Sequence, residues 1–245
     1  MTRAICLWSG PRNVSTAIMY SFARLDGVRV VDEPLYGHYL RVSGADHPGR
    51  EEVIAAMNCD GDAVMRDLLS AQAANPQPRL FMKHMAHHLV DIDTGFLDDT
   101  CNVLLIRDPR DMLPSLTVQL PQAGTDDTGL RQQCELFDDL RARGQEPAVL
   151  DSRELLCAPG PVLHRLCEKL GLGYDDRMLH WEAGARPEDG IWAPYWYHAV
   201  HASTGFAPYR AKHEFPDALR PLLDRCRPWY EKLFAHAIRA NGGTE

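Results

Sequence analysis

The feature that most constrains the fold is a short apolar run followed by a tight turn near the N-terminus. Residues 4–8, Ala-Ile-Cys-Leu-Trp, are short enough for one buried strand of a parallel sheet. Ser9, Gly10 and Pro11 then supply a turn, and residues 17–23 are suited to a helix. A strand, a tight turn and a helix N-terminus together present free backbone N–H groups to an anion. The sequence therefore predicts an α/β fold with an anion site near its beginning.

We call this turn the first loop. Its residues are Ser9, Gly10, Pro11, Arg12, Asn13, Val14, Ser15 and Thr16. The guanidinium of Arg12 has a planar fork that suits phosphate or sulfate oxygens. The loop differs from the Walker A pattern G-x-x-x-x-G-K-[ST], because it has one glycine and an arginine three residues before Ser15. An ordinary strand–turn–helix corner would show a similar pattern, so the anion site and the plain corner both stay open on this segment alone.

The composition excludes several classes of partner. The chain has 245 residues with a net charge of −8, which argues against binding to nucleic acid or to an anionic membrane. Its seven cysteines are odd in number and show no C-x-x-C spacing, which favours reduced cysteines in a cytoplasmic protein. No stretch has a signal-peptide pattern or approaches the roughly 18 apolar residues of a membrane span. We therefore expect a cytoplasmic protein whose anionic ligand is held by a local group of basic side chains.

Strands alternate with helices along the rest of the chain. Four further apolar runs predict strands at residues 28–31, 80–83, 102–106 and 148–150. The stretches between them have helical character, so the sequence predicts a doubly wound, mostly parallel sheet flanked by helices. No linker marks a boundary, and we expect a single domain over residues 1–245.

Three other segments have less regular patterns. Residues 35–50 are aromatic, contain glycine and lack a period, which predicts a loop. The polar residues 120–130 contain two glycines, and either segment is a candidate lid. Residues 219–240 are predicted to be helical, with Pro228 marking a break or a fresh start.

Basic side chains follow several of the predicted strands. Arg12, Lys83, Arg107 and Arg110 lie at or just after three strand ends. In open α/β sheets ligands bind beyond the carboxyl ends of the strands, so these cations are expected at one edge. Arg107 also has a plain structural interpretation, an ion pair with Asp111 four residues later. The agreement of three strand ends nevertheless favours an anion-binding active site.

These motifs give the chain a resemblance to the sulfotransferase family that uses 3′-phosphoadenosine 5′-phosphosulfate (PAPS). The first loop is similar to the family's 5′-phosphosulfate loop, with Arg12 at the place of the usual lysine. Arg107, Pro109 and Ser115 resemble the element that binds the 3′-phosphate. Residues 83–88 and 189–197 look like the divergent bacterial branch, some relatives of which are fused to aminotransferase-like domains. The resemblance implies a P-loop NTPase-like sulfotransferase fold.

The resemblance also implies a mechanism that needs no metal. Arg12 and Lys83 would neutralise charge on the sulfuryl group, which carries less charge than a γ-phosphoryl group. Family members carry their base in a Lys-x-His-x-Pro motif, whereas Met85 stands at the histidine position here. His87 or His88 is therefore predicted to be the base, and the sequence does not decide between them. Consecutive side chains point in different directions, so only one of the two can face the acceptor, and we favour His87, four residues beyond Lys83.

The expected acceptor is the hydroxyl or amine of a small organic molecule. Candidate acceptor-binding residues are the early Glu33, Tyr36 and Tyr39 and the late Trp192, Tyr195, Trp196 and Tyr197. Any one of these aromatics has an equally plain interpretation as a packing residue. We expect no nucleic-acid or membrane partner, and a homodimer is compatible with the sequence. The alternative functions are a P-loop nucleotide-dependent kinase of small molecules and a non-catalytic nucleotide-binding module.

Overall fold

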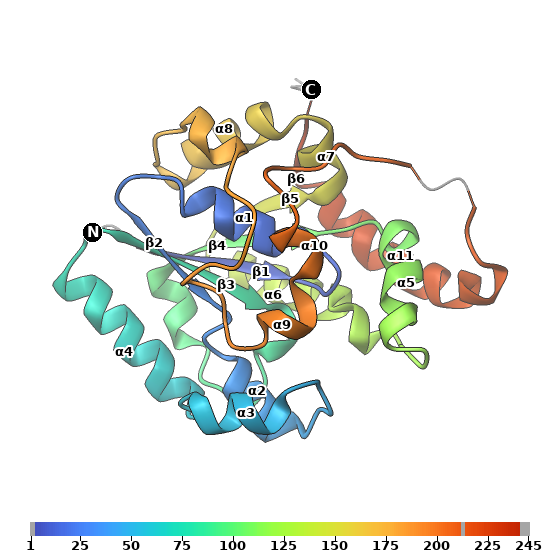
Figure 1. Ribbon diagram of the computed structural model, residues 1–245, viewed down its shortest axis with the longest axis horizontal. Coiled ribbons are helices and arrows are strands. Elements are labelled where there is room, and N and C mark those ends of the chain that lie inside the picture. The colour runs from blue at the N-terminus through green and yellow to red at the C-terminus, as the bar shows by residue number, and fades with distance from the viewer. Residues whose placement is uncertain (1–2, 212–213, 241–245) are drawn as a thin grey trace. The chain divides into compact units, whose positions relative to one another are not determined.

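A computed structural model describes residues 3–211 and 214–240, and over these residues the chain forms one six-stranded sheet (Figure 1). The strand order is β2-β3-β1-β4-β5-β6. The strands are β1 Ala4–Ser9, β2 Val28–Asp32, β3 Arg79–Met85, β4 Thr100–Ile106, β5 Ala148–Asp151 and β6 Ala237–Ile238. The pairs β2–β3, β4–β5 and β5–β6 are parallel. The predicted α/β class with a mostly parallel sheet flanked by helices is therefore confirmed.

The contacts within the chain divide it into two compact units that alternate along the sequence. Unit 1 comprises the residues up to Leu7, Ser15–Asn102 and Asp176–Gly205. Unit 2 comprises Trp8–Val14, Val103–Asp175 and the residues from Phe206 onward. The first loop therefore belongs to unit 2 up to Val14, and the helix that follows it belongs to unit 1.

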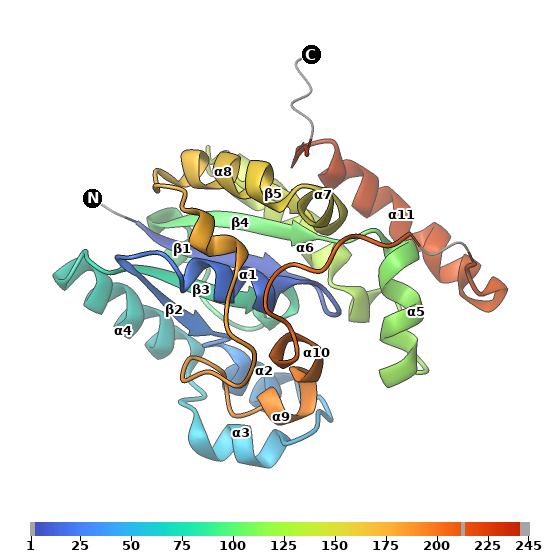
Figure 2. The same cartoon turned by 45° about the horizontal axis from the view of Figure 1, so that its top comes forward.

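Unit 1 packs helices around β2 and β3. Its α-helices are α1 Ser15–Phe22, α2 Tyr36–Ser43, α3 Arg50–Ala56, α4 Gly61–Ala74, α9 Ala193–Trp196 and α10 His198–His201. Its 3-10 helices are η1 Ala86–His88, η2 Gly95–Asp99 and η4 Asp176–Leu179. Phe22 and Phe81 stack in its core with their ring centroids 4.2 Å apart. Figures 1 and 2 both show α2, α3 and α9 grouped together. In the β2–β3 register Asp32 lies opposite Lys83, so the two strands deliver opposite charges to neighbouring positions.

Unit 2 surrounds β4 and β5 with the remaining helices. They are α5 Pro109–Gln119, α6 Leu130–Ala142, α7 Ser152–Cys157, α8 Pro159–Leu170 and α11 Arg220–Phe234, with the 3-10 helices η3 Asp126–Thr128 and η5 Asp217–Leu219. Helix α11 packs against α5 and α6. Asp108 and Asp151 cap α5 and α7 through their side chains. Asp108 lies two residues after the end of β4, and Asp151 is the last residue of β5, so the strand ends and helix starts of this unit are fixed locally.

The predicted loop at residues 35–50 is wrong, because Tyr36–Ser43 is helix α2. Tyr36 and Leu40 lie one turn apart and both are buried in a core that also contains Val53. The helix ends at Gly44, which adopts a left-handed conformation with φ 68°. The packing of these side chains, which no local pattern indicates, stabilises the helix.

The predicted helix over residues 219–240 is right in its first part and wrong in its last. Helix α11 runs through Pro228 without a break and ends at Phe234. Its apolar side has Leu223, Cys226 and Leu233 buried, which offsets the backbone hydrogen bond that Pro228 cannot make. Ala237–Ile238 then forms β6 against β5. A two-residue strand carries too little pattern to be recognised in the sequence.

No helix in the described part of the chain is both long enough and apolar enough to cross a lipid bilayer.

Candidate functional site

The first loop has a strained backbone and is fastened to the end of β4. Arg12 adopts φ 54°, in the left-handed region that residues other than glycine rarely occupy. The Asn13 side chain donates from Nδ2 to the carbonyl oxygen of Leu105 at 3.1 Å, and its Oδ1 accepts from the Val14 N–H at 2.9 Å. Strained conformations of this kind persist where the surroundings impose them, often at functional sites.

A second segment of unit 2, which contains Thr128 and Gln133, contacts the first loop and the strand ends beside it. A Cβ atom on Gly10 would lie 2.6 Å from the carbonyl oxygen of Thr128, so only glycine fits there. The buried side chain of Gln133 donates from Nε2 to the carbonyl oxygens of Trp8 and Leu105, at 3.1 and 2.8 Å. These contacts hold the two strand ends together. Nothing in the local sequence signals Gln133, and the sequence analysis missed it.

Three of the residues predicted to bind an anion meet in unit 2, and we call them the arginine cluster: Arg12, Arg107 and Ser115. Arg12 donates from Nε to the Oγ of Ser115 at 2.9 Å. Arg107 donates from Nη1 to the carbonyl oxygen of Arg12 at 2.7 Å. Neither bond uses a carboxylate, so both guanidinium groups keep their positive charge available to a ligand.

The arginine cluster borders a cavity of about 370 Å³. The cavity is lined by Arg107, Asp111, Leu156, Ala207, Pro208, Tyr209 and Arg210. Burial lowers the pKa of Arg107, and the charge of Arg12 lowers it further while Asp111 raises it. A guanidinium partly removed from water and beside a second cation gains strongly from a bound anion. The arrangement is therefore suited to a phosphate- or sulfate-bearing ligand.

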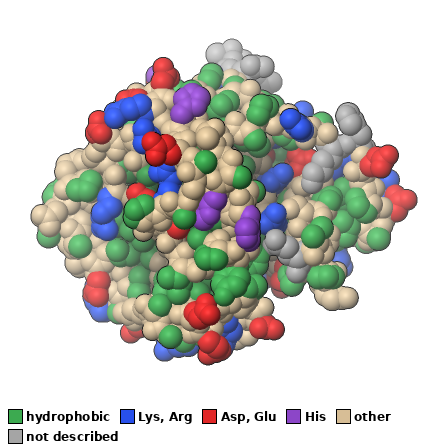
Figure 3. All heavy atoms as spheres, in the orientation of Figure 1, with side chains coloured by type: hydrophobic (Ala, Val, Ile, Leu, Met, Phe, Trp, Pro, Cys, Tyr) green, Lys and Arg blue, Asp and Glu red, His purple; other side chains and the backbone are tan. Residues whose placement is uncertain are grey.

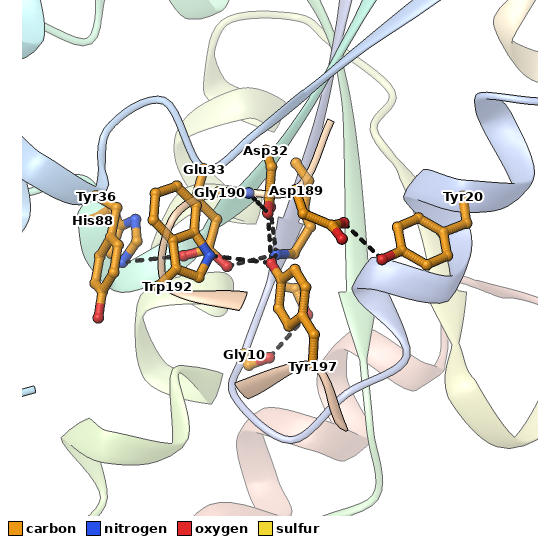
Figure 4. A network of polar contacts seen from close by, with 12 residues as sticks. Gly10, Tyr20, Asp32, Glu33, Tyr36, His88, Asp189, Gly190, Trp192 and Tyr197 are labelled. Carbon is orange, nitrogen blue, oxygen red and sulfur yellow. Dashed lines mark hydrogen bonds and ion pairs between the residues drawn. The ribbon is translucent and has the colours of Figure 1, made fainter. Parts of the chain in front are cut away.

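Unit 1 contains a second charged group, the lysine cluster, made of Lys83, Asp32, Glu33 and Tyr197 (Figure 4). The Nζ of Lys83 lies 2.7 Å from Asp32 Oδ1, 2.5 Å from Glu33 Oε1 and 2.6 Å from the Tyr197 hydroxyl. The side chain of Lys83 is only 1% exposed. An ammonium has three N–H donors, and these partners account for all three. The expected contact between Lys83 and the sulfuryl group stays a prediction, and the structure gives this ammonium carboxylate partners of its own.

Burial and charge act in opposite directions on the lysine cluster. Burial lowers the pKa of Lys83, but Asp32 and Glu33 raise it, and the balance is well above the usual value. Burial and the charge of Asp32 raise the pKa of Glu33, Lys83 lowers it, and the balance is above the usual value. Two carboxylates thus surround one ammonium, so the cluster carries no surplus positive charge that would attract an anion.

Residues 190–197, the late aromatic segment, are linked to this cluster by hydrogen bonds to Asp32. The Tyr197 hydroxyl donates to Asp32 Oδ2 at 2.7 Å, and the Gly190 N–H donates to the same oxygen at 3.1 Å. The indole of Trp192 donates to the Tyr197 hydroxyl at 3.2 Å. A Cβ on Gly190 would lie 2.1 Å from the Trp192 ring, so glycine is required beneath the indole. Figure 4 shows the Tyr197 hydroxyl turned toward Asp32 and the Trp192 indole nitrogen turned toward that hydroxyl.

The neighbouring Asp189 ties the same segment to α1. Its carboxylate accepts from the Tyr20 hydroxyl at 2.6 Å and contacts His201 Nε2 at 2.9 Å. Asp189 therefore has a supporting role in the structure, which the sequence analysis did not assign to it.

The candidate histidines lie in η1, next to the aromatic residues of α2. His88 is 1% exposed, and its ring stacks on Tyr36 and Tyr39 at centroid distances of 5.3 and 4.7 Å. His87 is partly exposed and meets Tyr39 edge to face at 4.9 Å. Burial lowers the pKa of His87 to about 4 and that of His88 well below its usual value, so both rings are neutral at pH 7.

Glu33 links the lysine cluster to these histidines. Its Oε2 lies 4.0 Å from His88 Nε2, and its backbone adopts φ 39°. Of the predicted acceptor residues, Tyr36 and Trp192 are buried and in edge-to-face contact at 5.0 Å, with Trp196 packed against the same core. Unit 1 thus brings together Glu33, both histidines, Tyr36 and Trp192, whereas the predicted Tyr195 is exposed and donates to Glu52 at 3.2 Å. The described residues contain no group of three or more His, Cys, Asp or Glu side chains arranged to hold a metal ion.

Comparison with known proteins matches this chain to a described protein family. A family model described as a sulfotransferase domain matches residues 3–237. The chain is 37% identical over 231 residues to the branched-chain-amino-acid aminotransferase-like protein 2 of Arabidopsis thaliana. That match covers 94% of this chain and 41% of the plant protein, so the chain spans about two fifths of the relative's length.

Two solved structures have a similar fold. The sulfotransferase from Alicyclobacillus acidocaldarius superposes with a TM-score of 0.55 at 14% identity, covering 96% of each chain. The sulfotransferase domain from the curacin biosynthetic pathway gives a TM-score of 0.52 at 15% identity, covering 96% of this chain and 98% of that one. At these identities the likeness concerns the fold.

Proposed function

The chain belongs to the sulfotransferase family, and from this we propose that it transfers a sulfuryl group from PAPS to the hydroxyl or amine of a small organic acceptor. The reaction forms a bond from the acceptor oxygen or nitrogen to sulfur. It breaks the bond from sulfur to the 5′-phosphate oxygen, and it releases 3′-phosphoadenosine 5′-phosphate (PAP) and a proton. The observation that carries the proposal is the arginine cluster: within the described residues neither guanidinium group hydrogen-bonds to a carboxylate, and Arg107 lines a cavity.

In this proposal the donor is held by unit 2. Arg12 and the backbone N–H groups of the first loop bind the phosphosulfate end, where negative charge accumulates during transfer. Arg107 and Ser115 bind the 3′-phosphate, and Arg107 also orients Arg12 through the carbonyl oxygen of that residue. The bond between Arg12 and Ser115 joins the two phosphate-binding elements.

The acceptor and the base are assigned to unit 1. His87, neutral at pH 7 because burial lowers its pKa to about 4, takes the proton from the acceptor. Its Nδ1 has no hydrogen-bond partner among the described residues. We assign His88 to support, since its ring lies between Tyr36 and Tyr39. Glu33, Tyr36, Trp192 and Trp196 contribute to the acceptor site.

We assign Lys83 to charge balance in place of donor binding. Its ammonium pairs with both Asp32 and Glu33, and through the Tyr197 hydroxyl it holds the aromatic segment near the acceptor residues. Such a residue acts by positioning others, because its own donors are already occupied.

The remaining properties favour a small-molecule enzyme of a reducing compartment. All seven cysteines are free, and four of them are buried, which supports a cytoplasmic location. On the face drawn in Figure 3, Lys and Arg side chains lie among Asp and Glu side chains. Together with the net charge of −8, this supports the absence of a nucleic-acid or membrane partner.

Thermal unfolding with three nucleotides tests the proposal. PAP at a hundred times its Kd is expected to stabilise the protein by about 2.7 kcal/mol without added metal. AMP, which lacks the 3′-phosphate, is expected to give a much smaller shift at the same concentration. Stabilisation by ATP with Mg²⁺, without any by PAP, would instead support the nucleotide-dependent kinase.

A further inference from the structure

The carboxylate of Glu33 has one oxygen to which no described residue donates a hydrogen bond. Its Oε1 accepts from the ammonium of Lys83 at 2.5 Å. Its Oε2 lies 4.0 Å from His88 Nε2, which is beyond hydrogen-bond distance. Buried carboxylates are normally hydrogen-bonded or paired with a cation. The Glu33 side chain is only 11% exposed, so Oε2 has lost most of its water without gaining a donor in return.

The charges around Glu33 do not balance. Lys83 is the cation that pairs with Glu33 in the described part of the chain, and it also donates to Asp32 at 2.7 Å. The second oxygen of Asp32 is already engaged, because the Gly190 N–H and the Tyr197 hydroxyl donate to it. Two carboxylates therefore share one ammonium. A further cation at Glu33 would offset this surplus of negative charge.

The neighbours of Glu33 Oε2 are suited to a positively charged group. His88 does not supply the missing charge, because burial lowers its pKa well below the usual value. Its Nδ1 has no hydrogen-bond partner among the described residues, although the ring is 1% exposed. Figure 4 shows the Glu33 carboxylate between His88 and Tyr197. The Tyr36 ring, which stacks on His88, is a favourable neighbour for a cation.

The spacing of the two side chains allows one ligand atom to contact both. Two atoms 4.0 Å apart can each lie about 2.8 Å from a third atom, which is a normal hydrogen-bond distance. A nitrogen with several N–H groups and a positive charge would donate to Glu33 Oε2 and to His88 Nε2 together. A primary ammonium group has these properties.

We infer that the acceptor is an amino alcohol whose ammonium group binds Glu33 Oε2 and His88 Nε2. The inference rests on the proposed function, in which Glu33 belongs to the acceptor site. An ammonium nitrogen has no lone pair, so the hydroxyl receives the sulfuryl group. The hydroxyl oxygen forms the bond to sulfur, the bond from sulfur to the 5′-phosphate oxygen breaks, and the hydroxyl proton goes to His87. Glu33 then selects the acceptor by its charge and orients its hydroxyl.

Two probes of the same shape test the inference. 2-Amino-1-phenylethanol carries an ammonium group where 1-phenylpropan-1-ol carries a methyl group, and the two have the same hydroxyl. Calorimetric Kd values are measured on the PAP-bound protein. The wild type is expected to bind the amino alcohol about 10- to 100-fold more tightly, as for a hydrogen bond to a charged group. Sulfuryl transfer from PAPS is expected to show the same preference in kcat/KM.

A pair of matched variants assigns the preference to Glu33. Glu33→Gln keeps the shape of the side chain without its charge, and is expected to bind the two probes within about threefold of each other. Lys83 then pairs with Asp32 alone, so the buried charges balance and the variant is expected to fold. Glu182→Gln makes the same change at an exposed carboxylate of unit 1, and is expected to keep the wild-type preference.

The outcomes separate this inference from the proposed function. A wild-type protein that binds PAP but binds the two probes equally, prefers the neutral alcohol or binds neither probe overturns the inference alone. An undiminished preference in Glu33→Gln overturns it as well, because the ammonium group would then bind elsewhere. Failure of the wild type to bind PAP would contradict the proposed function itself.

Discussion

The arginine cluster of unit 2 and the lysine cluster of unit 1 both contain cations near the ends of strands of the sheet, yet their surroundings are opposite. The guanidinium groups of Arg12 and Arg107 donate to a hydroxyl and a carbonyl oxygen, both uncharged. The ammonium of Lys83 donates to two carboxylates and a tyrosine hydroxyl. The first group can still bind an anion, while the charge of the second is already balanced. A basic residue at a strand end is therefore a ligand only if its charge remains available.

The largest effect on turnover is expected for substitution of His87, the residue of unit 1 that we propose as the base. His87→Ala is expected to lower turnover by about 100- to 10,000-fold, the usual contribution of a positioned base. Its affinity for PAP is expected to stay within about threefold of the wild type, because the donor is assigned to unit 2. Turnover is measured with the best acceptor from a panel of alcohols, phenols and amines. Losses below about tenfold in both His87→Ala and His88→Ala would remove the histidines from the mechanism.

The next effect concerns the stability of the lysine cluster. Lys83→Met leaves Asp32 and Glu33 buried without their cation, and is expected to lower the free energy of unfolding by about 3–5 kcal/mol. Lys83→Met combined with Asp32→Asn removes one charge of each sign and is expected to lose less. Urea unfolding of both variants measures the difference. A double variant no more stable than the single one would show that the charges do not compensate each other.

A smaller effect is the dependence of stability on pH. Burial lowers the pKa of His87 to about 4 in the folded protein, below its usual value of 6.5. Between these values the unfolded chain binds more protons, so stability falls as the pH falls from 6.5 toward 4. His87 contributes up to about 1.4 kcal/mol per pH unit to this slope. Urea unfolding at pH 7, 6 and 5 is expected to give a shallower slope for His87→Gln, and equal slopes would contradict the burial of the ring.

The sequence allowed much of the fold to be predicted because its strands are continuous apolar runs. The cap Asp108 lies two residues after β4 and the cap Asp151 is the last residue of β5, and the local pattern alone indicates where the chain turns. Helix α2 could not be predicted, since burial of Tyr36 and Leu40 against distant residues stabilises it. The short β6 was missed because two residues have no period.

The candidate site, like the fold, could be predicted from the sequence only in part. The contacts among Arg12, Arg107 and Ser115 agree with motifs that are contiguous in the sequence. Two partners of Lys83 are residues 32 and 33. The third, Tyr197, lies more than a hundred positions after Lys83 in the sequence. A one-dimensional pattern shows that a lysine lies near the end of a strand, but it does not show that carboxylates already surround it.

The measurement that tests the central claim most directly is the Kd of PAP for one variant of each cluster. Arg107→Ala is expected to weaken PAP by about 30-fold or more, since loss of one partner of a charge-assisted contact costs about 2–5 kcal/mol. Lys83→Met with Asp32→Asn, the charge-balanced double variant, is expected to bind PAP within about threefold of the wild type. The reverse result, with PAP binding lost in the Lys83 variant and kept in Arg107→Ala, would contradict the account.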